Sequence, residues 1–187
     1  MSRERCLAEL KQEQAAKKGD LRMIALKIED LKTFTAQLFM GETFDYWLVR
    51  EANIVTFNSF TIDGRIRQGY YSDEEMETNR IEELSSWKTL RPFCYSLIRG
   101  RKLPESFQIT LQLSPEENEK FIRRVKPDLS ADQVAALYLN IRYENHAAAC
   151  VTGTSLKIFM LDKQIEQEWD ETVRRYFKKL QIPYVEV

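Results

Sequence analysis

The chain has 187 residues, of which 43% are hydrophobic and 30% charged, and its formal net charge is -1. This length and hydrophobic content suit one folded domain with a substantial core. The balanced charge does not indicate a strongly basic nucleic-acid binder or an acidic tail, although a local basic face is compatible with a total near zero.

Cysteine usage indicates the compartment. Cys6, Cys94 and Cys150 are far apart, odd in number and lack C-x-x-C spacing. Secreted chains usually carry an even number at close spacing, so a reducing compartment is favoured. No apolar run approaches the roughly 20 residues that span a bilayer, and residues 1–22 lack an apolar signal core. We therefore expect a cytoplasmic protein that does not cross a membrane.

The chain divides near Met23. Residues 1–22 are rich in Lys, Glu, Gln and Ala, and they read as a helix-prone N-terminal extension. A single domain is expected over 23–187, beginning with a strand over 23–28. A helix over 30–40 follows, because Leu, Phe and Leu recur on one face before a glycine.

The next segment is β-rich over 46–71. Asp63-Gly64 suits a two-residue hairpin turn; alternatively Ala52-Asn53 is the turn and the strand runs through Gly64. The acidic residues 72–83 are expected to form a solvated loop. The sequence does not decide between the two turns.

A second helix is expected over 86–99, with Ser85 or Ser86 as its cap. Pro92 lies inside that pattern, either in the first turn or at a bend. Residues 107–113 then alternate between apolar and polar as a half-buried strand does.

The segment 115–136 reads as two short helices split by Pro127. Ser114, followed by a proline and then by glutamate at the third helical position, is a strong helix start. Ser130 and Gln133 repeat the capping pattern before the shorter helix. We expect this segment to be a helical insert between strands.

The final third resumes alternation from Leu137 to Tyr143, and Asn145-His146 reads as a turn. A strand over 147–151 pairs back, and Thr152-Gly153-Thr154 is expected to turn again into a strand over 156–160. A last helix over 163–181 carries an apolar stripe. Pro183 ends this helix, and a short edge strand follows.

An internal repeat is the most informative feature. The spacing Leu31-x-x-Phe34-x-x-x-Leu38-x-x-Gly41 recurs 59 residues later, at Leu90, Phe93, Leu97 and Gly100. Helix, glycine and strands follow in the same order in both copies. Since each helix must bury its stripe against a sheet, the repeat predicts an α+β domain made of a duplicated helix-plus-antiparallel-strands unit, with approximate twofold symmetry.

The element order over 23–161 resembles one domain of the DNA sliding clamps. Residues 27–31 resemble the opening strand-to-helix step of such a domain, and residues 150–158 resemble its closing hairpin. The resemblance implies a DNA-clamp-like fold. The helical insert over 115–136 and the long C-terminal helix depart from the clamp pattern.

A closer resemblance comes from residues 31–64, which include Thr56-Phe57-Asn58-Ser59-Phe60, and from residues 84–93. Both stretches resemble a family of uncharacterised bacterial proteins of similar length. That family implies no activity and no functional residues.

Few residues suggest catalysis. His146 is the single histidine and reads as an exposed turn residue, while Cys94 and Cys150 read as inert core residues. Asp63, Asp162 and Asp170 have no partner that spacing identifies. Neither a zinc spacing nor a phosphate-binding glycine motif occurs. The sequence therefore predicts no enzyme, no cofactor and no metal.

The only functional lead is a set of basic residues. In a clamp, helix Lys and Arg residues face DNA phosphates, and the resemblance implies the same face here. These contacts would be sequence-independent and salt-sensitive. The residues are Lys32, Lys88, Arg91, Arg99, Arg101 and Lys102.

Two functions follow from this interpretation. The first is a non-enzymatic, clamp-like scaffold or binding domain that self-associates through sheet edges and touches DNA weakly. The alternative is a protein-interaction or regulatory module without DNA contact, which holds a partner protein by its last helix or a sheet edge.

Overall fold

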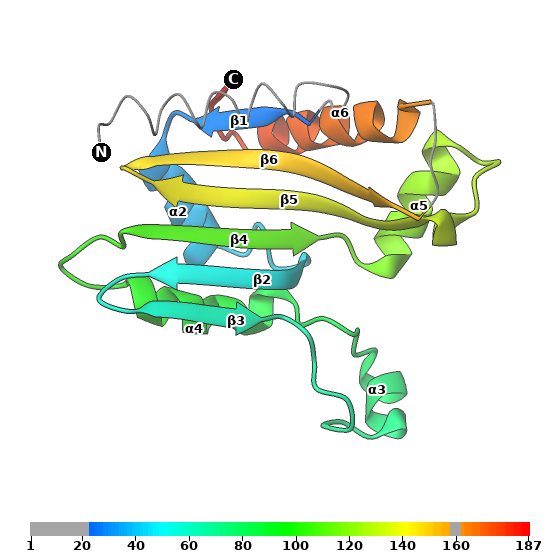
Figure 1. Cartoon of the computed structure of the whole chain (residues 1–187), viewed down its shortest axis with the longest axis horizontal. Helices are drawn as coiled ribbons and strands as arrows, with labels where there is room; N and C mark the ends of the chain where they lie inside the picture. The colour runs from blue at the N-terminus through cyan, green and yellow to red at the C-terminus, as the bar shows by residue number, and fades with distance from the viewer. Residues whose placement is uncertain (1–22, 158–161) are drawn as a thin grey trace, which may run out of the picture.

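Figure 1 shows the computed structural model of the chain, which describes residues 23–157 and 162–187. Seven strands form one sheet: β1 (Ala25–Ile28), β2 (Leu48–Val55), β3 (Ser59–Asp63), β4 (Ser106–Gln112), β5 (Val134–Glu144), β6 (Ala147–Leu156) and β7 (Tyr184–Glu186). The helices of this part are α2 (Leu31–Phe39), α3 (Asp73–Asn79), α4 (Trp87–Ile98), α5 (Pro115–Val125), the 3-10 turn η1 (Ala131–Gln133) and α6 (Gln164–Lys179). The predicted extension over 1–22 lies outside the described residues.

The strand order is β3-β2-β4-β5-β6-β1-β7, and every neighbouring pair is antiparallel. Successive side chains point to opposite faces of a sheet. Along β4, Phe107, Ile109 and Leu111 are buried while Gln108 is exposed, as the sequence alternation predicted. The α+β class is therefore confirmed, and one face of the sheet carries the core.

Helices α2, α4, α5 and α6 bury their apolar stripes in a single core with that face. Figure 1 shows α2 and α4 behind the sheet. Phe34 and Leu38 of α2 and Trp87 of α4 are fully buried, and the Trp87 indole N–H donates to the Leu38 carbonyl over 2.7 Å. Burying one large apolar side chain stabilises the fold by about 1.5–3 kcal/mol, so these contacts hold the two helices on the sheet.

Helix starts follow the predicted caps. Ser86 accepts a hydrogen bond from Thr89 N at the start of α4, and Ser114 accepts one from Glu117 N at the start of α5. Such caps satisfy amide groups that have no partner inside the helix. Pro92 lies in the second turn of α4, rather than the first, so the carbonyl one turn before it loses a backbone donor.

The turn between β5 and β6 is the predicted one. Asn145 and His146 both have positive φ, 52° and 60°. Two-residue hairpin turns of this kind require positive φ at both central positions, and asparagine tolerates it best among non-glycine residues.

The hairpin between β2 and β3 differs from both sequence alternatives. Its loop is Thr56–Asn58, closed by Thr56 N donating to Asn58 O over 2.9 Å. Ala52 cannot be the turn because it is fully buried in the middle of β2. Gly64 lies just beyond β3, where its Cα packs against the carbonyl of Val49.

The expectation of an acidic loop over 72–83 is wrong in part. Residues 73–79 form α3, which starts with a complete capping box between Ser72 and Glu75. Three acidic residues in its first turn also favour the helix, because they face its positive end. None of its residues is buried, which explains why hydrophobic periodicity gave no signal.

The predicted turn at Thr152-Gly153-Thr154 is also wrong. β6 continues straight to Leu156, with Gly153 opposite Tyr138 on β5. Thr152 is buried, and its hydroxyl donates a hydrogen bond to Asp170 on the last helix. A residue type that is common in turns therefore lies in a strand here. Of the strand predicted over 156–160, Leu156 ends β6 and residues 158–160 lie outside the described residues.

The duplication is not confirmed and stays a prediction. α2 and α4 do precede β2 and β4, which lie side by side in the sheet. However, Phe34 is fully buried whereas Phe93, its counterpart in the repeat, is 62% exposed. The equivalent positions therefore do not share one role in packing.

Candidate functional site

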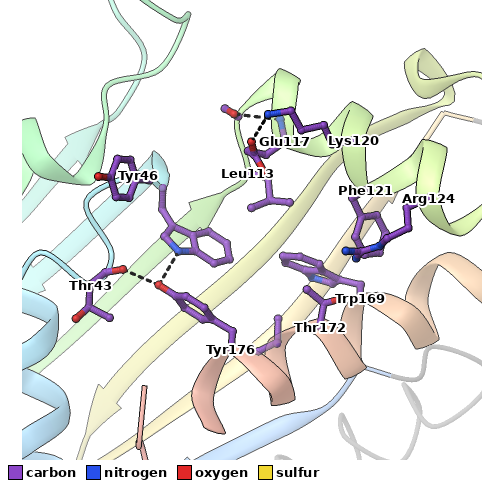
Figure 2. Close-up of a pocket in the computed structure, with 13 residues that line it drawn as sticks. Thr43, Tyr46, Leu113, Glu117, Lys120, Phe121, Arg124, Trp169, Thr172 and Tyr176 are labelled. Atoms are coloured by element: carbon purple, nitrogen blue, oxygen red, sulfur yellow. Dashed lines mark hydrogen bonds and ion pairs between the residues drawn. The ribbon is translucent and has the colours of Figure 1, made fainter. Parts of the chain in front are cut away.

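One concavity is a groove between α5, α6 and the segment that leads into β2. We call it the aromatic groove, and its volume is about 740 Å³. Its lining residues are Thr43, Tyr46, Trp47, Leu113, Ser114, Glu117, Lys120, Phe121, Arg124, Trp169, Thr172, Val173 and Tyr176. Figure 2 shows that the three walls come from segments far apart in the sequence.

Aromatic rings form the floor of the groove. The Trp47 ring lies 6.0 Å from that of Trp169 and 5.9 Å from that of Tyr176, measured between ring centroids. Phe121 meets Trp169 edge-on at 5.7 Å. Such contacts fix ring positions in advance, so an incoming apolar group would meet a rigid surface.

Hydrogen bonds hold the floor in place. The hydroxyl of Tyr176 donates to the Thr43 carbonyl over 2.6 Å and accepts from the Trp47 indole N–H over 3.3 Å. Burial raises the pKa of Tyr176, so its hydroxyl keeps the proton that it donates. The indole of Trp169 donates to the Tyr138 carbonyl of the sheet over 2.9 Å. Each buried polar group of these rings thus has a partner.

The rim along α5 is charged. Lys120 bridges Glu116 and Glu117, at 2.8 Å from each, and these bonds raise the Lys120 pKa. Arg124 lies over the ring of Phe121 at 5.5 Å, and within the described chain it has no ion pair. Tyr46 closes the opposite rim and is 91% exposed.

The structure separates the six predicted basic residues. Lys32, Lys88, Arg99, Arg101 and Lys102 are exposed on α2, on α4 and in the loop after α4. Arg91 instead forms a two-bond ion pair with the buried Asp45, at 2.9 and 3.0 Å. Its charge is therefore neutralised by an ion pair within the fold.

The other candidate residues are two buried cysteines, an exposed histidine and three aspartates. Burial raises the pKa of the Cys94 thiol to about 12 and that of Cys150 as well, so neither forms a thiolate readily. His146 is exposed in its turn. Asp162 accepts from Lys126 and from the Gln164 amide, which lowers its pKa.

Asp63 and Asp170 complete the sequence candidates. Asp63 accepts from the Arg65 amide beyond β3. Asp170 is buried and accepts from the Thr152 hydroxyl. Within residues 23–157 and 162–187, no group of three His, Cys, Asp or Glu side chains could hold a metal ion.

Sequence reasoning missed the aromatic groove. Trp169 and Tyr176 lie in the predicted helix over 163–181, and Trp47 lies in the predicted β-rich segment over 46–71. The signal was present in composition, because Trp and Tyr cluster in both segments. Their meeting depends on how α6 packs beside the 43–47 segment, which the sequence does not specify.

The fold and the groove define a class: a domain with an antiparallel sheet, helices on its core face and a preformed aromatic groove. The chain belongs to the DUF5721 family, a family of unknown function, whose model matches residues 37–185. The predicted resemblance to an uncharacterised family is thereby confirmed. No curated protein and no solved structure matches the chain, so the resemblance to a sliding-clamp domain stays a prediction. No described helix is long and apolar enough to cross a membrane.

Proposed function

We propose that this protein is a non-catalytic binding domain that holds a partner protein by taking one of the partner's apolar side chains into the aromatic groove. The observation that carries the proposal is the position of Tyr46, which is 91% exposed beside a floor of packed rings. An exposed apolar surface that borders a groove and is rimmed by polar residues is typical of an interaction site.

The composition of the groove favours a protein partner. Trp, Tyr and Arg dominate the binding energy of protein interfaces, and Tyr46, Tyr176 and Arg124 all line the groove. A small molecule confined to the groove would leave the outward-facing ring of Tyr46 uncovered, whereas a protein surface would cover it.

A non-catalytic role is supported by the charges at the rim. Catalytic acids and bases need pKa values tuned toward neutrality. Glu116 and Glu117 are bonded to Lys120 instead, and those bonds lower the pKa of Glu116 and raise that of Lys120. Glu116 and Lys120 are thus held in their charged forms, which suits electrostatic contact with a partner.

Photo-crosslinking in living cells tests the proposal. A benzophenone amino acid in place of Tyr46 should give a discrete protein adduct. The same substitution at Tyr70, which is 74% exposed but outside the groove, should not. Thr172→Trp fills the groove from α6 and should abolish the Tyr46 adduct. An adduct that survives this change would show that the groove is not where the partner binds.

A second candidate function is the clamp-like scaffold that touches DNA through its helices. It is favoured by the exposure of five of the six predicted basic residues, and by the position of α2 and α4 before adjacent strands. Duplex DNA binding should be detectable at low salt and should weaken when Lys88, Arg99 and Lys102 are changed to Glu. Arg91 must stay intact, because changing it would disturb the fold.

The scaffold would assemble through its sheet edges, β3 and β7. Strand edges present unpaired backbone groups that can pair with another chain. Light scattering on the purified protein would separate a monomer from a closed assembly, and a monomer at high concentration would remove this part of the proposal. A cytoplasmic location is supported by Cys94 and Cys150, which are buried and free.

A further inference from the structure

A second concavity lies on the face of the sheet opposite the core. The chain leaves the sheet after β3 and returns at α4, and the two limbs of this excursion are bridged at Arg65 and Leu84. Figure 1 shows α3, which the excursion carries, standing away from the sheet beyond β3. Between the excursion and the ends of β4, β5 and β6 lies a groove of about 820 Å³. We call it the arginine groove.

The arginine groove lies on the face of the sheet that does not carry the core. Gln112, Tyr138 and Ser155 line it. Gln112 lies opposite Tyr138 in the register, and its neighbour Leu111 belongs to the buried face. The site is therefore separate from the aromatic groove, and its volume is in the range of small-molecule sites.

Three arginines line this groove: Arg50 from β2, and Arg65 and Arg67 from the excursion. All three are exposed. The Arg50 guanidinium donates to the Tyr138 hydroxyl over 3.3 Å and lies 5.7 Å from the centre of that ring. Arg50 is thereby held over the floor of the groove.

None of the three arginines is neutralised by an ion pair within the described residues. Asp73 and Glu83 also line the groove, but neither lies within 4 Å of an arginine nitrogen. Elsewhere arginines such as Arg91 and Arg174 do pair with carboxylates. Unpaired guanidinium groups around one concavity favour an anion, and their planar fork matches a phosphate best.

The floor offers a further polar contact. Gln112 Oε1 is buried and has no hydrogen-bond partner among the described residues. A buried acceptor without a partner is costly, and rotation of the Gln112 amide would turn this oxygen toward a ligand hydroxyl or amine in the groove. The rings of Tyr71 and Tyr138 add apolar surface beside it. The ligand thus needs an anionic group, a hydrogen-bond donor and a flat apolar part.

We propose that the arginine groove binds a small phosphate-bearing molecule, with the phosphate on Arg50, Arg65 and Arg67 and the remainder against Tyr138 and Gln112. This proposal is independent of the protein partner in the aromatic groove. A concavity of this size favours a small ligand over a polynucleotide, which would need a basic track that continues beyond the groove.

Calorimetric titration with inorganic pyrophosphate and with adenosine monophosphate, in a phosphate-free buffer, tests the proposal. We expect saturable binding of both probes at one site. Arg65→Ser and Arg67→Ser should each weaken it about tenfold or more, because each removes a charge-assisted hydrogen bond. Arg123→Ser and Arg175→Ser remove exposed arginines of α5 and α6 and should leave the affinity within about twofold.

Three results would overturn the proposal. The first is no saturable binding of either probe to the wild-type chain. The second is an equal loss for the Arg65 and Arg123 variants, which would indicate attraction to overall charge. The third is binding only to single-stranded oligonucleotides, with affinity that rises with length. Circular dichroism of each variant distinguishes loss of binding from loss of folding. Because the side chains of Arg65 and Arg67 are exposed, we expect both variants to fold.

Discussion

Arg91 holds Asp45 by two parallel hydrogen bonds, from Nε to Oδ1 over 2.9 Å and from Nη2 to Oδ2 over 3.0 Å. The Asp45 side chain is only 6% exposed. A third bond runs from Arg91 Nη1 to the Met40 carbonyl over 3.2 Å. One guanidinium on α4 thus fixes the segment that leads into β2, and that segment carries Tyr46 and Trp47 to the aromatic groove.

Arg91→Ala should lower the free energy of unfolding by about 3–5 kcal/mol, because it leaves the buried Asp45 carboxylate without its partner. Urea unfolding followed by tryptophan fluorescence measures the change. Lys88→Ala, which alters an exposed side chain on the same helix, should stay within about 0.5 kcal/mol of wild type. Equal stability of the two variants would show that the pair contributes little.

Local features of the fold were predictable where one short segment determines them. Ser86 and Ser114 cap helices because their side chains bond amides three residues ahead, and Asn145-His146 turns because both residues tolerate positive φ. Gly153 shows the limit of such reasoning. It sits in a strand because of what lies across from it on β5, and propensity alone favoured a turn.

The aromatic groove could not be predicted, because three separate segments build it. Thr43, Phe121 and Tyr176 are far apart in the sequence, and only the packing of α5 and α6 beside the 43–47 segment brings them together. The same holds for Arg91, whose partner lies 46 residues away. The sequence correctly predicted that Arg91 lies on a helix. Its charge alone could not show that the guanidinium is paired with the buried carboxylate of Asp45.

Gly64→Ala should destabilise the fold by at least about 3 kcal/mol. A Cβ at this position would lie 1.7 Å from the Val49 carbonyl oxygen, and backbone cannot yield as a flexible side chain can. Gly153→Ala is the matched control, since its nearest neighbour would be Asn140 Nδ2 at 3.4 Å. Thermal unfolding of both variants distinguishes them. A well-folded Gly64→Ala protein would mean that β2 and the excursion can separate at little cost.

Tyr176→Phe should cost about 1–3 kcal/mol of stability, because it leaves the Thr43 carbonyl and the Trp47 indole without their shared hydroxyl partner. The same variant should weaken partner binding if the groove must be rigid. Tyr46→Phe removes a hydroxyl of the same kind from a fully exposed ring and should leave stability unchanged. Chemical denaturation compares the two, and identical midpoints would show that the hydroxyl of Tyr176 does not stabilise the groove.

Asp170 should make stability depend on pH in the direction opposite to most carboxylates. Its side chain accepts from the Thr152 hydroxyl over 2.5 Å, and Thr152 accepts from the Ile24 amide over 3.1 Å, so the group joins α6, β6 and the residue before β1. Burial raises the Asp170 pKa above its ordinary value of 3.8; the Thr152 bond and Arg174 oppose this shift, and Glu166 adds to it.

Because the folded pKa is the higher one, the folded state binds more protons than the unfolded state just above pH 3.8. The contribution of Asp170 to stability therefore falls as pH rises from about 4 through the folded pKa. Asp170→Asn can still accept from Thr152 but cannot ionise, so it should gain stability relative to wild type as pH rises from 4 to 7. Urea unfolding at four pH values measures this difference. A difference between Asp170→Asn and wild type that does not change with pH would show that the buried carboxyl titrates as it does in water.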